Sequence, residues 1–172
     1  MDESTAKPEL EQFLASVPMP HGGEASTLSF EHSPLVLLAV AGNRYSREAG
    51  RLFKGRHQQS LMIWRVLGLL ASKPGVTVAF ATRTTGIDKA AVSRALATLE
   101  ESALATTEAS VSDPRRKIWW LSEAGYDLHR EMLQTSLEIH QTLLHGLSDD
   151  ESRELARLLS IVSANFSDIA EG

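Results

Sequence analysis

The sequence predicts a mostly α-helical protein with one small antiparallel β element. Apolar residues recur at the helical spacings of three and four along most of the chain. Good N-cap residues, Ser33, Asp88 and Ser148, precede three of these stretches. Only residues 104–108 and 117–121 have strand character. A length of 172 residues, with 42% hydrophobic and 23% charged residues, is typical of one soluble domain with appendages.

Composition excludes several classes of protein. The absence of cysteine excludes disulfides, thiolate catalysis and Cys-bound zinc. The most apolar run, residues 35–41, is far shorter than a membrane span, and the acidic first ten residues do not resemble a signal peptide. We therefore expect a cytoplasmic protein without a membrane partner.

The expected elements have a characteristic order. They are helices over about 34–53 and 60–72, a short helix over 77–85, a turn at 86–87, a helix over 88–102, the two strands, and long helices over about 122–145 and 148–169. A short helix, turn and helix followed by a hairpin is the winged helix-turn-helix arrangement. We expect this lobe, with its two-stranded β-wing, over residues 59–121, and flanking helical segments over 34–58 and 122–172.

The overall charge conceals a strong partition along the chain. The net charge of −5 is the sum of −5 over residues 1–33, +7 over 34–121 and −7 over 122–172. A basic central segment indicates a polyanionic partner, although pairing between basic and acidic segments is the simpler alternative. Residues 1–33 contain three prolines and little periodicity, and we expect a partly flexible acidic arm with at most one short helix.

The exposed face predicted for helix 88–102 suits a DNA major groove. It carries small residues, two cations and a hydroxyl: Lys89, Ala90, Ser93, Arg94 and Ala97. Arg94 can address guanine O6 and N7, Ser93 a base or a phosphate, and Lys89 a phosphate. The alternative is an ordinary amphipathic helix whose cations only solubilise it.

The predicted hairpin tip adds a second cationic element. Asp113 and Pro114 precede three consecutive cations, Arg115, Arg116 and Lys117. Such a tip can lie along the DNA backbone or enter the minor groove. Asp113 repels phosphate, so we expect it to orient Arg115 through an ion pair. A solvated turn is the alternative.

A set of short motifs runs through residues 60–125: Trp64-Arg65-Val66-Leu67, Phe80-Ala81, Gly86-Ile87, Val92-Ser93-Arg94-Ala95-Leu96, Leu99-Glu100, Asp113-x-Arg115 and Leu121-Ser122-Glu123-Ala124-Gly125. Through these motifs the segment resembles the MarR family of winged helix-turn-helix transcriptional regulators, and the flanking helices fit that family's dimerisation module. The resemblance implies a homodimer on a pseudo-palindromic double-stranded DNA operator, with a repressor released by a small effector.

Four positions depart from the family pattern. Ala103 stands where a glycine usually ends the recognition helix, so we expect that helix end to be remodelled. Thr107 replaces a common arginine, which removes one expected phosphate contact, and Thr85 replaces a common leucine. Trp120 replaces a polar residue beside Trp119, and strand alternation predicts that one of the two indoles is exposed or covered by another segment.

The first two helices supply candidates for the effector site implied by the resemblance. Arg44, Tyr45, His57, Trp64 and Arg65 could bind an aromatic acid or its CoA thioester. The alternative is that they are core aromatics and interface arginines. The last two helices carry more apolar positions than one stripe needs, which favours burial against a second subunit.

Other classes of function were weighed against this prediction. An enzyme needs a nucleophile with a base or paired carboxylates, and the six scattered histidines provide neither, so we expect no enzyme and no cofactor. A metal sensor using His129, His140 or His145 with Glu138 lacks the i, i+4 spacing of helical zinc sites. A winged-helix module that binds protein without specific DNA binding is the stronger alternative.

Overall fold

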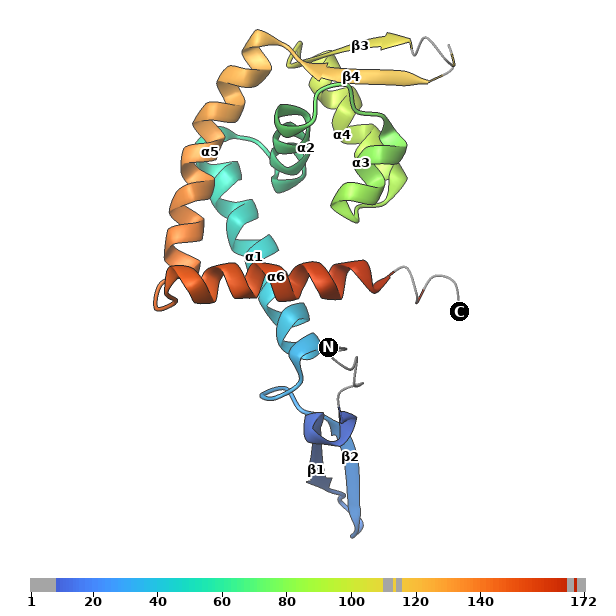
Figure 1. Cartoon of the computed structure of the whole chain (residues 1–172), viewed down its shortest axis with the longest axis vertical. Coiled ribbons are helices and arrows are strands. Elements are labelled where there is room, and N and C mark those ends of the chain that lie inside the picture. The colour runs from blue at the N-terminus through green and yellow to red at the C-terminus, as the bar shows by residue number, and fades with distance from the viewer. Residues whose placement is uncertain (1–8, 110–112, 114–115, 167–168, 170–172) are drawn as a thin grey trace, which may run out of the picture. The chain divides into compact units, whose positions relative to one another are not determined.

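The structure, a computed structural model, describes residues 9–109, 113, 116–166 and 169 (Figure 1). It divides into two compact units, residues 1–61 and 62–172. The elements are a 3-10 turn Leu10–Phe13, β1 Leu14–Pro18, β2 Glu24–Leu28, α1 Pro34–His57, α2 Leu61–Ser72, α3 Val78–Thr85, α4 Lys89–Glu101, β3 Ala105–Ala109, β4 Lys117–Leu121, α5 Glu123–Leu143 and α6 Asp149–Ala164. The mostly α-helical winged-helix fold is confirmed. No described helix is long and apolar enough to span a membrane.

The first unit contains a β-hairpin that the sequence pattern does not predict. Strands β1 and β2 pair antiparallel, from Leu14 opposite Leu28 to Pro18 opposite Glu24. Gly22 and Gly23 adopt φ values of 87° and 86° in the connecting turn, a conformation that costs glycine little. The expected short helix is present as the 3-10 turn that precedes β1.

Helix α1 follows the hairpin and is longer than predicted. Pro34 occupies its first turn, and Ser33 is its N-cap residue although the Ser33 side chain makes no capping hydrogen bond. The helix continues past Phe53 to His57 and ends where Gln58 turns left-handed, at φ 57°. The Gln58 amide donates to the Lys54 carbonyl and closes the last turn.

The second unit is built around the apolar side of α4. Helices α3 and α4 pack together, and the β3–β4 wing follows directly (Figure 1). Strands β3 and β4 pair antiparallel, and Val76 adds one further bridge to Trp119. The fully buried side chains of this unit come from α2, α4 and α5: Val66, Leu67, Leu70, Val92, Leu96, Leu99 and Met132.

Helices α5 and α6 differ in how much of their apolar surface the chain covers. Helix α5 buries Met132 and Ile139, whereas no described residue of α6 is buried. On α6 the exposed apolar side chains include Leu155, Leu158 and Ile161. The predicted capping box is confirmed: the Ser148 hydroxyl accepts from the Glu151 amide, and the Glu151 carboxylate accepts from the Ser148 amide.

Candidate nucleic-acid interface

Helices α3 and α4 are joined by a tight turn. Gly86 ends α3 with φ 66°, and its amide donates to the Thr82 carbonyl. Asp88 then caps α4, because its Oδ1 accepts the Ala91 amide at 2.9 Å. Val92, Leu96 and other residues of α4 are buried on one side of the helix, so the opposite side is held in a fixed orientation.

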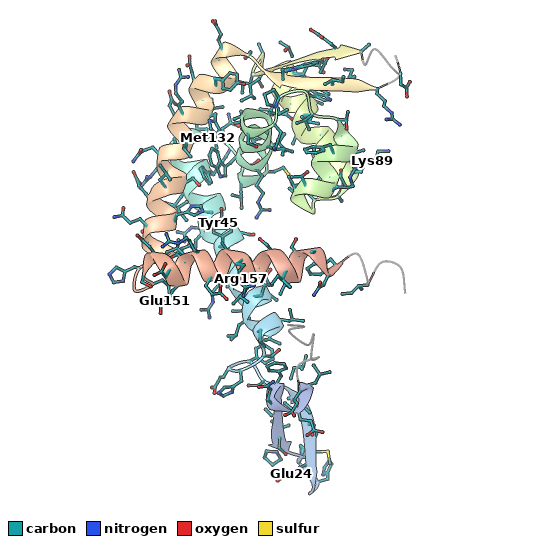
Figure 2. The ribbon with its side chains drawn as sticks, viewed as in Figure 1. Glu24, Tyr45, Lys89, Met132, Glu151 and Arg157 are labelled. Atoms are coloured by element: carbon teal, nitrogen blue, oxygen red, sulfur yellow. The ribbon has the colours of Figure 1, made fainter. Side chains whose placement is uncertain are left out.

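The predicted recognition face is exposed. Lys89, Ala90, Ser93 and Arg94 are all exposed on α4, and Ala97 is half-buried. Figure 2 shows Lys89 on the outer side of the α3–α4 pair. Within the described ranges, no carboxylate forms an ion pair with Lys89 or Arg94, which leaves both charges available to an external anion.

One further cation near this face was not predicted. Arg83 lies exposed in the last turn of α3, next to the turn that leads into α4. In helix-turn-helix proteins the first helix crosses the DNA backbone, so a cation at this position suits a phosphate. The sequence did contain one signal for Arg83 as a DNA-binding candidate, namely its position in the predicted short helix just before Gly86.

The C-terminal end of α4 keeps the geometry that a glycine normally provides. Ala103 adopts φ 56°, its amide donates to the Glu100 carbonyl at 2.9 Å, and the Leu104 amide donates to the Leu99 carbonyl at 2.8 Å. These two bonds form a Schellman motif with alanine in the left-handed position. The expectation of a remodelled helix end was therefore wrong.

Replacing Ala103 by glycine should stabilise the protein by about 1 kcal/mol, because glycine removes the Cβ strain of the left-handed conformation. Urea unfolding at equilibrium measures this gain. Ser102→Gly is the matched control: Ser102 has φ −87°, so glycine relieves no strain there and should lower the stability. Equal effects of the two substitutions would contradict the assignment of strain to Ala103.

The start of α5 is fastened to this same helix end. The Ser122 amide donates to the Leu104 carbonyl at 3.1 Å, and the Ser122 hydroxyl donates to the Ala103 carbonyl at 2.7 Å. That hydroxyl also accepts the Gly125 amide and so caps α5. Gly125 lies against the Leu104 carbonyl with no room for a Cβ. The Leu-Ser-x-x-Gly motif, residues 121–125, thus joins the C-terminal end of α4 to the start of α5.

At the wing, the described cations have different environments. The Arg116 Nε lies 3.2 Å from the Asp113 carboxylate, and both side chains remain partly exposed. Arg115, for which an ion pair with Asp113 was expected, lies outside the described residues. Asp113 therefore pairs with Arg116, and its ion pair with Arg115 stays a prediction.

Lys117 points into a small polar cluster between the wing and α4. Its Nζ lies 3.2 Å from the Glu100 carboxylate and 5.3 Å from the centre of the Trp119 ring. Thr107 donates its hydroxyl to the same carboxylate at 2.8 Å. The Thr107 hydrogen bond, followed by Lys117, lowers the pKa of Glu100 below its usual value. Lys117 thus contacts both a carboxylate and an aromatic ring, whereas Arg116 forms an ion pair with Asp113, and Thr107 has a structural partner.

The two adjacent tryptophans have different exposures. Trp119 is 4% exposed, whereas Trp120 is half-buried. The bridge to Val76, with hydrogen bonds of 3.1 and 2.9 Å in both directions, fixes which indole faces the interior. No described group accepts the buried Trp119 Nε1–H.

The candidate effector residues belong to different units. Arg44, Tyr45 and His57 lie on α1, where the His57 ring is 6.2 Å from that of Phe53. Trp64 and Arg65 are half-buried on α2. Trp64 stacks on His129 of α5, with ring centres 5.4 Å apart and planes at 15°. No group of three His, Asp or Glu side chains in the described part of the chain could hold a metal ion.

The His129–Trp64 stack should make stability depend on pH. Burial, and to a lesser extent Arg130, lowers the pKa of His129 in the folded state. The unfolded chain then binds the proton more tightly, so stability should fall as the pH decreases through the ordinary histidine pKa of about 6.5. Thermal unfolding of wild type and His129→Gln between about pH 8 and pH 5.5 measures this. The variant should lose less stability on acidification, and an unchanged slope would contradict the prediction.

Comparisons with known proteins agree with this geometry. The model of the MarR family matches residues 60–116. The resemblance to the MarR family is confirmed. The matched MarR segment contains α2 to α4, β3 and the wing tip, and no curated protein matches the sequence.

Solved MarR structures share the fold. A MarR/EmrR family transcriptional regulator from Acinetobacter sp. ADP1 is 21% identical, with a TM-score of 0.74 over 82% of this chain and 99% of that one. MepR of S. aureus in complex with DNA is 22% identical, with a TM-score of 0.66 over 79% and 99%. Bordetella bronchiseptica BpsR, whose DNA binding is regulated by 6-hydroxynicotinic acid, is 21% identical, with a TM-score of 0.62 over 74% and 98%.

Proposed function

We propose that this MarR-type chain is a homodimeric transcriptional repressor that binds a pseudo-palindromic DNA operator and is released by a small effector. The exposed face of α4 carries the proposal. There Lys89, Ser93 and Arg94 form a slim surface whose two cations have no described carboxylate partner. Asp88, which precedes Lys89 in the sequence, is occupied as the helix N-cap.

The contacts divide into those that position the protein and those that read sequence. Arg94 and Ser93 face base edges. The small side chain of Ala90 lets α4 come close to the bases in a major groove about 12 Å wide. Lys89 and Arg83 bind phosphates on either side, and the wing residues Arg116 and Arg115 reach the backbone or the adjacent minor groove. Lys117 contributes less because Glu100 already pairs with it.

A second subunit is supported by the apolar surface that one copy leaves uncovered. Leu35 of α1, Leu137 of α5 and Leu158 of α6 are 61%, 53% and 46% exposed. Large apolar side chains left exposed on several helices favour a protein interface over a solvated surface. Two lobes held across a two-fold axis place their recognition helices on half-sites about 34 Å apart. The solved complex of MepR with DNA supports DNA binding by a protein of this fold.

We propose an aromatic acid or its CoA thioester as the effector, bound by Arg44, Tyr45, His57, Trp64 and Arg65. The regulation of BpsR by 6-hydroxynicotinic acid, itself an aromatic acid, supports this class. A panel of aromatic acids and their CoA esters should contain at least one compound that releases the operator in a mobility-shift assay. Arg44→Ala should then require more of that compound without losing the operator. If the whole panel has no effect, this class of effector is wrong.

Selection of duplexes from a random pool tests the central proposal. A two-fold related consensus should emerge, and its affinity should fall steeply as salt rises, because bound cations displace counterions from the phosphates. If no duplex is enriched, the alternative, a winged-helix module that binds protein, is favoured.

A further inference from the structure

Within the first unit, the N-terminal hairpin leaves most of its large apolar side chains exposed. An isolated two-stranded hairpin is marginally stable in water and needs a further surface to pack on. Here the hairpin and its flanking turns expose large apolar side chains: Leu10, Leu14, Val17, Met19, Leu28 and Phe30, at 41–72% exposure. Some further surface should therefore cover them.

Hydrogen bonds connect the base of the hairpin to the N-cap residue of α1. The Ser29 amide donates to the Phe13 carbonyl at 2.7 Å, and the Ser33 amide donates to the Ser29 carbonyl at 3.2 Å. The Ser29 hydroxyl also accepts the amides of Glu31 and His32, and Ser29 and Ser33 are buried. Within this first unit the hairpin continues beyond the N-terminal end of α1, with Glu24 near its far end (Figure 2).

Charge indicates what kind of surface the hairpin meets. Residues 9–33 contain four glutamates and no Lys, Arg or Asp, so the hairpin repels DNA and attracts cations. In the same unit, the second half of α1, residues 44–57, contains five Lys or Arg against Glu48. We name this half the cationic half of α1. Arg47 and Arg51 share Glu48, and their side chains remain 64% and 77% exposed.

We propose that the hairpin, residues 9–33, docks on the cationic half of α1 in a second copy of the chain. The inference rests on the proposed homodimer. If the exposed Leu35 and Leu38 of two copies meet across a two-fold axis, the two α1 helices run antiparallel. Arg51 then lies 13 residues beyond the crossing, about 20 Å along the partner helix. A five-residue strand spans about 17 Å, which brings the hairpin alongside that segment.

The absence of cysteine allows a direct test by cross-linking. Two full-length variants, Ser26→Cys in β2 and Arg51→Cys in α1, carry tags of different size and are mixed before oxidation. We expect a mixed disulfide dimer. The mixture of Ser26→Cys with Leu35→Cys, at the other end of α1, is the matched control and should give much less. A stronger cross-link to Leu35→Cys would overturn the proposed site.

A chain that carries both Ser26→Cys and Arg51→Cys distinguishes docking on the partner from folding back. Disulfides between copies support the inference, and disulfides within one copy overturn it. Sedimentation equilibrium of the unmodified chain separates the two proposals. A stable dimer without the Ser26–Arg51 cross-link would refute the docking alone, whereas a monomer would refute the proposed homodimer and the docking with it.

Charge reversal provides an independent measurement. Arg51→Glu with Lys54→Glu, or Glu24→Arg with Glu31→Arg, should each weaken dimerisation about tenfold. Combining all four substitutions should restore most of the affinity, because the opposite charges again face one another. If the fourfold variant does not regain dimer affinity, the proposed docking is wrong and the hairpin binds some other surface, such as an unrelated protein.

Discussion

Replacing Gly125 by alanine is expected to destabilise the second unit by about 3 kcal/mol, the upper part of the range for overpacked interiors. The added Cβ would overlap the Leu104 carbonyl oxygen and press against the Leu121 side chain. The Leu104 carbonyl cannot yield easily, because it accepts the Ser122 amide and is part of the α4 helix end. Urea unfolding with circular dichroism measures the loss.

The effect should extend from stability to DNA binding. Ser122 fastens α5 to the Ala103 and Leu104 carbonyls, so displacing Leu104 also displaces the end of the recognition helix. Gly68→Ala is the matched control, since a Cβ there meets nothing within 4 Å and α2 should gain up to about 1 kcal/mol. A Gly125→Ala protein as stable as Gly68→Ala would show that the junction between α4 and α5 is not rigid.

Replacing Arg94 by alanine is expected to weaken operator binding by about 1–3 kcal/mol and to relax the preference at one base pair of each half-site. Arg94 is exposed on α4 and makes no described ion pair, so it is free to bind a base edge in a bidentate manner. Fluorescence anisotropy with the selected operator and its single-base variants measures both effects.

The wing provides matched comparisons for this experiment. Arg116→Ala should weaken binding to all duplexes to a similar degree and reduce the salt dependence, because its target is phosphate. Lys117→Ala should weaken binding less, since Glu100 and the Trp119 ring already hold that ammonium group. Arg130→Ala on α5 removes a cation paired with Asp127 and should leave affinity unchanged. Equal losses for Arg94, Arg116 and Arg130 would indicate only a general charge effect and contradict the proposed base contact.

Local signals were sufficient to predict α4. Its N-cap, Asp88, and its buried stripe of Val92, Leu96 and Leu99 lie within a dozen residues, and each acts through its sequence neighbours. The β1–β2 hairpin could not be predicted in this way. Both strands are short, and in each of them four positions of five are exposed, so neither shows the alternation that identifies a half-buried strand.

The remaining differences arise from contacts distant in sequence. The left-handed Ala103 closes a local Schellman motif, and Ser122, 19 residues away, also donates its hydroxyl to the Ala103 carbonyl. Lys117 turns toward Glu100, 17 residues away, although the local run of cations indicated a DNA contact. The choice between Trp119 and Trp120 depends on a bridge to Val76. These outcomes required the tertiary structure.

In the proposed homodimer, the exposed leucines of α6 make the stability of this helix depend on protein concentration. The capping box of α6 and its Asp150–Arg153 and Glu154–Arg157 ion pairs all lie within the helix. Such exposed ion pairs add little to helix stability in water. A helix of 16 residues is marginal alone, so its order depends on whatever covers its leucines. If a second copy provides that cover, as proposed above, folding and assembly become one equilibrium, and dilution is expected to unfold α6.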